Sequence, residues 1–212
     1  MRETREQLSD RLRLLLLLDA CEAAGVAPIA LARLHAMLFF ASVLAPIWSV
    51  TSIDGKVLKD SDGPFYPDLQ RELDRLVGLG YVIVRDVSYV RESNRWRLNA
   101  SYALNTATTG DIFAVARSFE TERRLIAFLR RLAYAISQSE GAIESFVGSD
   151  ATWSDVRTGT GDIIDFAEWR RANYSAYVAH SFNDFAPTTT GATRGEMLQL
   201  YLRLLERRAN AS

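Results

Sequence analysis

Residues 67–104 read PDLQRELDRLVGLGYVIVRDVSYVRESNRWRLNASYAL, and this stretch decides the fold. Pro67 to Leu79 is predicted to be a helix, because proline suits a first helical turn and leucines recur three and four residues apart among charged residues. Gly80 supplies the left-handed residue that ends such a helix. After Gly80 the apolar residues no longer recur at helical spacing but in the pattern of a strand. Tyr81 to Val84 and Arg95 to Leu104 are therefore predicted to be two strands of a hairpin, with a polar turn between them.

Two further helices are expected before this stretch. The first begins near Thr4, which has capping-box spacing to Gln7, and it ends at Gly25. The second runs from about Leu31 to Leu44 and is apolar on nearly every side, so it should lie at the centre of the fold. Residues 54–63 are predicted to be a loop. Two helices, a helix that ends in glycine and a hairpin are, in this order, typical of a winged helix-turn-helix.

The second half of the chain is predicted to be helical. The fold class is therefore mainly α with a small β-hairpin, as a winged-helix domain over residues 1–108 and a helical C-terminal region over residues 109–212. A polar loop is expected from Gly148 to Asp162. Helices are expected at Phe119 to Ile136, Ala142 to Val147, Phe166 to Phe182 and after the Thr193–Glu196 capping-box pair.

Composition limits the classes of function. The 212 residues carry a net charge of −1, whereas dedicated nucleic-acid binders usually show a basic excess, so any DNA contact must come from a local patch. A single cysteine makes no internal disulfide, and no apolar segment follows the first residues as in a signal peptide. A cytoplasmic protein is expected. The apolar stretch from Ala36 to Val50 is too short to span a bilayer and is expected to be a core helix.

Motifs of catalysis and cofactor binding are mostly missing. The sequence contains no phosphate-binding loop, no dinucleotide fingerprint beyond Gly159-Thr160-Gly161 and no nucleophile elbow. Cys21, His35 and His180 lack the spacing of metal ligands. We expect no catalytic residue, no cofactor and no metal site. His35 is expected to be a core histidine, and Cys21 a small buried hydrophobe.

One group of carboxylates allows two interpretations. It either caps and solvates a polar loop, or binds Mg²⁺ or acts as an acid/base pair. The first interpretation is preferred, because no basic or histidine partner is expected to complete a mechanism with the group. Its members are Asp150, Asp155, Asp162 and Asp165.

Arginines are candidates for DNA contact. Those of the hairpin are opposed in sequence only by Asp86 and Glu92, and arginine forks suit phosphate oxygens, so a contact between the wing and the DNA backbone is one interpretation. A solvated hairpin or a protein contact is the other. In the Pro67 helix, Arg71 and Arg75 are offset by three carboxylates, which makes base reading doubtful. The hairpin candidates are Arg85, Arg91, Arg95 and Arg97.

Two large aromatic residues are candidates for a partner interface. Trp169 and Tyr201 both fall in predicted amphipathic helices. Aromatic side chains are enriched where interfaces concentrate their energy. The alternative is that both belong to the core.

Several strings together resemble a known family. They are Asp54-Gly55-Lys56, Lys59 to Leu79, Ile164-Asp165-Phe166, Asn173-Tyr174-Ser175 and Tyr201 to Leu205. They resemble the middle component of bacterial ABC three-component systems, encoded beside an SMC- or Rad50-like coiled-coil ATPase, often in anti-phage defence loci. The resemblance implies an accessory subunit that bridges the ATPase and an effector or DNA. The expected subunit is also similar to winged-helix accessory subunits of bacterial condensin-type complexes, which often form homodimers.

Three functions are therefore compared. The first is the non-catalytic accessory subunit of an SMC/Rad50-like ATPase complex in anti-phage or anti-plasmid defence. The second is a winged-helix transcriptional regulator that binds operator DNA as a dimer, which conflicts with the acidic Pro67 helix and the lack of net positive charge. The third is a metal enzyme that uses the Asp150 to Asp165 carboxylates. The first is expected.

Overall fold

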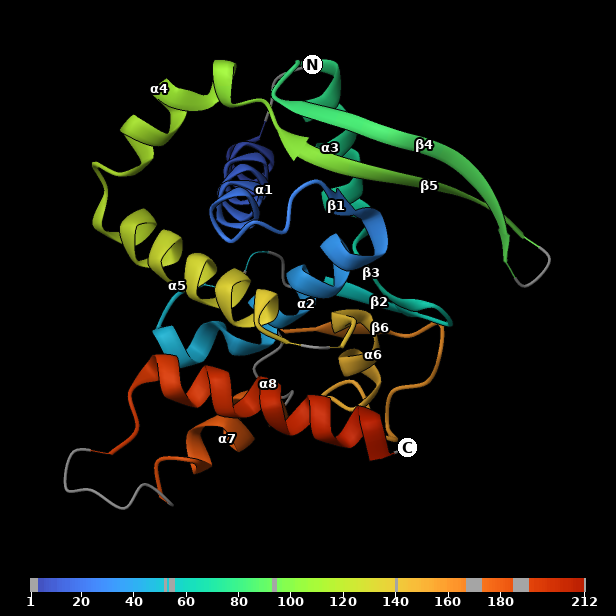
Figure 1. The fold of residues 1–212 in the computed structure, drawn as a ribbon, viewed down its shortest axis with the longest axis vertical. Helices are drawn as coiled ribbons and strands as arrows, with labels where there is room; N and C mark the ends of the chain where they lie inside the picture. The colour runs from blue at the N-terminus through green and yellow to red at the C-terminus, as the bar shows by residue number, and fades with distance from the viewer. Residues whose placement is uncertain are drawn as a thin grey trace.

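The computed structural model describes residues 4–51, 53, 56–92, 95–139, 141–166, 173–184 and 191–211. These residues form eight helices and two small antiparallel sheets, so the fold is mainly helical (Figure 1). The helices are α1 Arg5–Ala23, α2 Leu31–Trp48, α3 Pro67–Gly78, α4 Thr106–Ala116, α5 Glu120–Ser137, α6 Ile143–Gly148, α7 Tyr174–Ser181 and α8 Arg194–Ala211. The strands are β1 Ile29–Ala30, β2 Lys56–Asp60, β3 Gly63–Phe65, β4 Val82–Glu92, β5 Arg95–Leu104 and β6 Ile163–Asp165.

The first two helices make the centre of the molecule. The capping box predicted for α1 is present, with Gln7 N donating to Thr4 Oγ1 at 3.2 Å and Thr4 N donating to Gln7 Oε1 at 3.1 Å. Every residue of α2 from Leu34 to Ala45 is buried, which confirms the predicted central helix. By length and composition α2 is apolar enough to cross a membrane, yet 72% of it is buried within the fold. Its apolar surface is thus used for packing.

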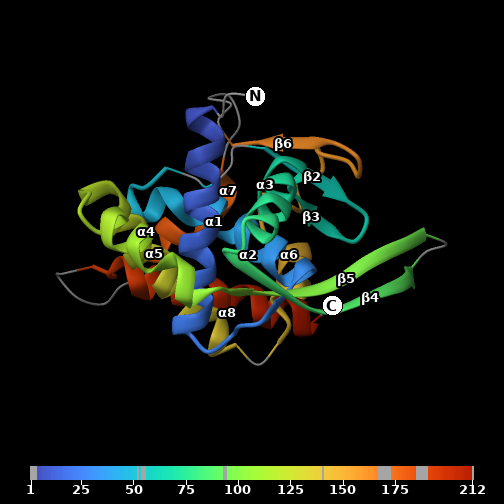
Figure 2. The ribbon, with the colours of Figure 1, turned by 90° about the horizontal axis from the view of Figure 1, so that it is seen from above.

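The predicted hairpin is confirmed, but its first strand, β4, continues beyond the predicted end at Val84 as far as Glu92. Strands β4 and β5 pair over most of their length, and β1 pairs with β5, so the first sheet has the order β1-β5-β4. Helix α3 precedes this hairpin and is followed by Gly80, whose φ of 76° is the left-handed conformation expected there. Beyond β1 the two strands extend away from the helical body (Figures 1 and 2).

The loop predicted at residues 54–63 is partly wrong. Residues 56–60 form β2, which pairs with β3 on one side and with β6 on the other. Strand β6 comes from the second half of the chain, and the pairing sets Val57 against Ile164, both fully buried. Local pattern favours a loop because charged residues surround Val57. The distant partner strand and the buried pair override it.

Both halves of the chain share one core. The predicted boundary at residue 108 falls within the start of α4, and α5 packs on α1 and α2 while α7 and α8 pack on α2. Helices α5, α6 and α8 confirm three predictions, and the Thr193–Glu196 capping box is present at α8. The helix expected from Phe166 is observed only as α7; residues 167–172 lie outside the described chain. Residues 149–162 are turns, as expected for the polar loop.

His35 is a core histidine, as expected. Its Nδ1 accepts a hydrogen bond from the Tyr66 backbone N at 3.3 Å, and its Nε2 lies 3.2 Å from Gln70 Oε1. The ring stacks on Tyr66 and touches Phe65, so it joins α2 to the start of α3. Burial lowers the pKa of His35 from its usual 6.5 to about 4. The imidazole is therefore neutral at physiological pH.

This shift predicts a pH dependence of stability. Below pH 6.5 the unfolded chain binds a proton at His35 that the folded chain does not, so stability falls as the pH drops towards 4 and levels off below it. The loss attributable to this group is at most about 3 kcal/mol. Urea unfolding of the wild type and of His35→Gln, followed from pH 7.5 to 4, measures it. We expect a smaller loss in the variant; identical slopes would contradict the assignment.

Candidate functional site

The projecting hairpin exposes large apolar side chains. The exposed fractions are 71% for Tyr89, 69% for Trp96 and 59% for Val87. Single exposed apolar residues are normal on a soluble domain, but an apolar group on one element marks an interaction surface. These side chains lie on strands that leave the body (Figure 2). We refer to Tyr89, Arg91 and Trp96 as the hairpin face.

A bulge determines which residues share that face. Arg85 pairs with Ser101 but Ser88 pairs with Asn99, so two residues of β4 oppose one of β5. Asp86 has a φ of 52° at this point, and its Oδ2 accepts a hydrogen bond from Ser101 Oγ at 2.8 Å. Beyond the bulge Arg91 pairs with Trp96, and cross-strand partners lie on the same face. The register of the inner hairpin, continued without the bulge, would have put Val90 opposite Trp96.

The hairpin arginines are spread along both strands. Arg85 lies beside the bulge and is exposed, and Arg91 is exposed on the hairpin face. The register pairs Arg95 with Glu92 and Arg97 with Val90; the side chains of these two arginines lie outside the described structure. The predicted candidates therefore lie along both strands of one hairpin.

The arginines of α3 are matched by carboxylates of α3. Arg71 pairs with Asp68, and Arg75 Nη1 lies 2.6 Å from Glu72 Oε1. Glu72 is buried and also accepts a hydrogen bond from Arg11 Nε at 2.6 Å, which ties α3 to α1. Glu72 thus fixes Arg75 beside the contact between α3 and α1, while the Arg71–Asp68 pair lies on the surface of α3. Both pairs weaken the interpretation of Arg71 and Arg75 as base-reading residues.

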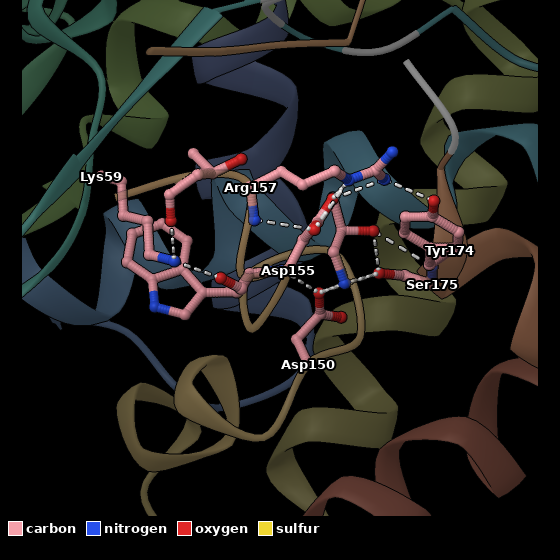
Figure 3. A network of polar contacts seen from close by, with 9 residues as sticks. Lys59, Asp150, Asp155, Arg157, Tyr174 and Ser175 are labelled. Atoms are coloured by element: carbon pink, nitrogen blue, oxygen red, sulfur yellow. Dashed lines mark hydrogen bonds and ion pairs between the residues drawn. The ribbon is translucent and has the colours of Figure 1, made fainter. Parts of the chain in front are cut away.

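Asp150 is an internal anchor. It is fully buried, and its Oδ1 accepts hydrogen bonds from Thr152 N at 2.8 Å, Trp153 N at 3.0 Å and Ser175 Oγ at 2.8 Å (Figure 3). Its Oδ2 accepts one from Tyr201 Oη at 2.6 Å. Burial raises the pKa of Asp150, and these hydrogen bonds oppose the rise. The carboxyl thereby joins the 150–153 turn to α7 and α8.

The interface assignment of Tyr201 is wrong for this fold. Its side chain is only 1% exposed and its hydroxyl is held by Asp150, so it belongs to the core. Burial raises the pKa of Tyr201 well above its usual value, which keeps the phenol protonated as a donor. The helical stripe was read correctly, but a stripe does not reveal whether another element of the chain covers it. Trp169 lies outside the described residues.

The other loop carboxylates have local partners. Asp155 forms a bidentate pair with Arg157, which also contacts the Tyr174 hydroxyl (Figure 3). Asp162 Oδ2 accepts from Gly159 N at 2.7 Å. Within the described ranges, no group of three or more His, Cys, Asp or Glu residues is placed to hold a metal ion. Asp150, Asp155 and Asp162 thus act as caps and anchors, the interpretation preferred from sequence.

Lys59 and Cys21 are also held inside the structure. Lys59 Nζ donates to the backbone oxygens of Trp153 at 2.5 Å and Thr158 at 2.9 Å, so it fastens β2 to the polar turns (Figure 3). Cys21 is fully buried beside Met37, and burial raises the pKa of its thiol to about 12. A thiol of that kind stays protonated and unreactive. This agrees with its expected role as a small hydrophobe.

Two surface hollows were not anticipated. One, of about 710 Å³, lies between the first turns of α1 and the α4–α5 corner and includes Val115 and Phe119. The other, of about 420 Å³, is lined by α7 residues, His180 among them, and by Met197 of α8. His180 is exposed there. Neither hollow is lined by the loop carboxylates, the candidate arginines or Tyr201.

In comparisons with known proteins, the sequence matches no family model and no curated protein.

The apolar content of the hairpin face was missed from sequence. Tyr89 and Trp96 alternate with other residues as core-facing strand residues do, so the pattern indicates a strand but not what covers it. Val87, Tyr89, Val90 and Trp96 put apolar residues on both faces of the hairpin, and such a pattern does not show whether another element covers either face.

The hydrogen bond between Asp150 and Tyr201 predicts that the Tyr201 hydroxyl contributes to the stability of the fold. Tyr201→Phe removes the hydrogen bond to Asp150 Oδ2 inside the core, so we expect a loss of about 1.5–3 kcal/mol in the free energy of unfolding. Tyr177→Phe is the matched control, because Tyr177 is 75% exposed, and it should change stability by less than about 0.5 kcal/mol. Urea denaturation measures both. Equal effects would show that the Tyr201 hydroxyl has no special role.

Proposed function

We propose that this chain is a winged-helix, non-catalytic accessory subunit that joins an SMC/Rad50-like coiled-coil ATPase to an effector subunit or DNA. Its setting is the bacterial cytoplasm, in defence against phages or plasmids. The observation that carries the proposal is the hairpin face, where Tyr89 and Trp96 are each more than two-thirds exposed on strands outside the core. Such a surface serves to bind a partner.

The order of elements supports the winged-helix part of the proposal. Helix α1, strand β1, helices α2 and α3 and the β4–β5 hairpin follow one another along the chain, and the sheet order is β1-β5-β4. In a winged helix the hairpin is the wing and α3 stands in the recognition position. The β2–β3 hairpin between α2 and α3 is an addition to that plan, and it is held by β6.

The segments that carry the family resemblance have structural roles in this chain. Lys59 to Leu79 contains β3 and α3, with Tyr66 fully buried against His35. Ile164 completes the β2–β6 pairing, and Ser175 and Tyr201 meet at Asp150. The resemblance thus concerns residues that hold the fold. This supports a shared scaffold for partners better than a shared active site.

The charges favour backbone contact over base reading if DNA is bound. Arg85 and Arg91 are exposed on the hairpin. On α3, Arg71 and Arg75 form ion pairs with Asp68 and Glu72 of the same helix. Carboxylates on a recognition helix repel phosphates in a groove. An operator-binding regulator, the alternative, needs α3 to read bases, and these pairs disfavour it.

The proposal is tested by purifying the tagged chain from its native host at physiological salt and identifying bound proteins by mass spectrometry. We expect a coiled-coil ATPase in fixed stoichiometry, with no such protein recovered by the tag alone. Recovery of the chain by itself, or with one specific DNA fragment, would reject the accessory-subunit proposal in favour of the regulator.

The charge distribution also predicts how DNA affinity responds to substitution. Arg85→Ala and Arg91→Ala should each weaken duplex binding to a similar degree on all sequences, and lower the slope of log affinity against log salt by about 0.9. Arg71→Ala on α3 is the matched control and should change neither quantity. Titration of labelled duplexes at several salt concentrations measures the slopes. A change of sequence preference in Arg71→Ala would restore the base-reading interpretation.

A further inference from the structure

The hairpin face combines two aromatic rings with an arginine. Arg91 pairs with Trp96 across the strands, and Tyr89 is the diagonal neighbour of Trp96 on the same face. All three residues are exposed, with 71% of Tyr89 and 69% of Trp96 open to solvent. No core function explains two aromatic side chains at that exposure. Their arrangement points to a ligand that uses ring faces.

The spacing suits a nucleobase. Diagonal neighbours on one face of an antiparallel pair lie about 7 Å apart, within reach of aromatic side chains. Tyr89 and Trp96 are therefore close enough on one face for neighbouring bases of one strand to reach both rings.

Charge distinguishes a nucleic acid from an apolar protein partner. The strands and turn of the hairpin contain four arginines and only two carboxylates, Asp86 and Glu92, in a chain whose net charge is −1. A local positive excess around exposed rings complements a polyanion that also offers π-faces. The hairpin projects from the helical body (Figures 1 and 2).

The rings can reach bases only where bases are unpaired. In a duplex the base faces are stacked on one another, whereas in a single strand they are available to aromatic side chains. We propose that the hairpin face binds single-stranded nucleic acid, with unpaired bases stacked on Tyr89 and Trp96 and with Arg91 beside the phosphates. This inference deepens the proposed function by naming the ligand class of its hairpin, and it rests on that function only for the biological setting.

The test is fluorescence anisotropy of the full-length chain with labelled oligothymidylate and oligouridylate of about 15 nucleotides, a length within the usual site sizes. A mixed-sequence duplex of equal length is the comparison. We expect tighter binding to the single strands than to the duplex. Trp96→Ala should weaken single-strand binding at least about fivefold, and Trp96→Phe should weaken it less, because a ring remains. Comparison of the two oligonucleotides tells DNA from RNA.

Control experiments separate a specific loss of nucleic-acid binding from misfolding and from the removal of any exposed aromatic ring. Tyr177→Ala removes an equally exposed aromatic residue from α7 and should leave binding unchanged. Circular dichroism and thermal unfolding should be the same for Trp96→Ala and the wild type, since Trp96 is 69% exposed.

Two outcomes would overturn the inference. One is binding to duplex and single strand alike that Trp96→Ala leaves intact, because the arginines alone then make the contact. The other is an absence of binding to either oligonucleotide, which leaves a protein as the ligand of the face. Neither outcome affects recovery of the ATPase, so the failure of this inference and that of the proposed function are distinguishable.

Discussion

An α-helix that is apolar on every side must be enclosed on every side, and α2 imposes this constraint on the rest of the chain. Its residues Leu34 to Ala45 are all buried. Elements from both halves of the sequence pack against it, including α5, α6, α7 and α8 together with β1, β3 and β5. Removing the C-terminal helices would expose a continuous apolar surface at the centre of the molecule. The two predicted regions therefore contribute to one hydrophobic core around α2.

Three buried polar side chains, those of His35, Glu72 and Asp150, have internal partners and locate the elements around α2. His35 links α2 to Tyr66 at the start of α3, while Glu72 links α3 to α1 through Arg11. Asp150 links the polar turns to α7 and α8. An unsatisfied buried polar group costs about 1–3 kcal/mol, so each of these contacts disfavours alternative packings of the same helices. The polar contacts thus select one packing of the helices, which apolar contacts alone specify less sharply.

Sequence patterns were informative where structure is local. The capping boxes of α1 and α8 and the glycine after α3 depend on residues within a few positions of each other, and all are present. The β4–β5 hairpin pairs two segments that follow one another along the chain, and it is present as well. The β2–β6 pairing joins residues about a hundred positions apart, and no local pattern encodes it. The same limit explains Tyr201, whose covering partner Asp150 lies 51 positions away. The hairpin arginines could be found from sequence, but the exposure of Tyr89 and Trp96 could not.

The open edges of the hairpin strands give its arginines a second explanation besides nucleic-acid binding. Strand β4 is an edge strand, and among the described residues β1 covers only Ser101 and Tyr102 of β5, so the projecting part is open on both sides. Open edges invite pairing with other chains, and proteins limit this with charged side chains and bulges. The bulge at Asp86 and the arginines fit that protective role without any ligand. Exposed aromatic rings do not fit it, because they promote association. The positive charge alone is therefore a weak argument for nucleic-acid contact, and Tyr89 and Trp96 carry the functional argument.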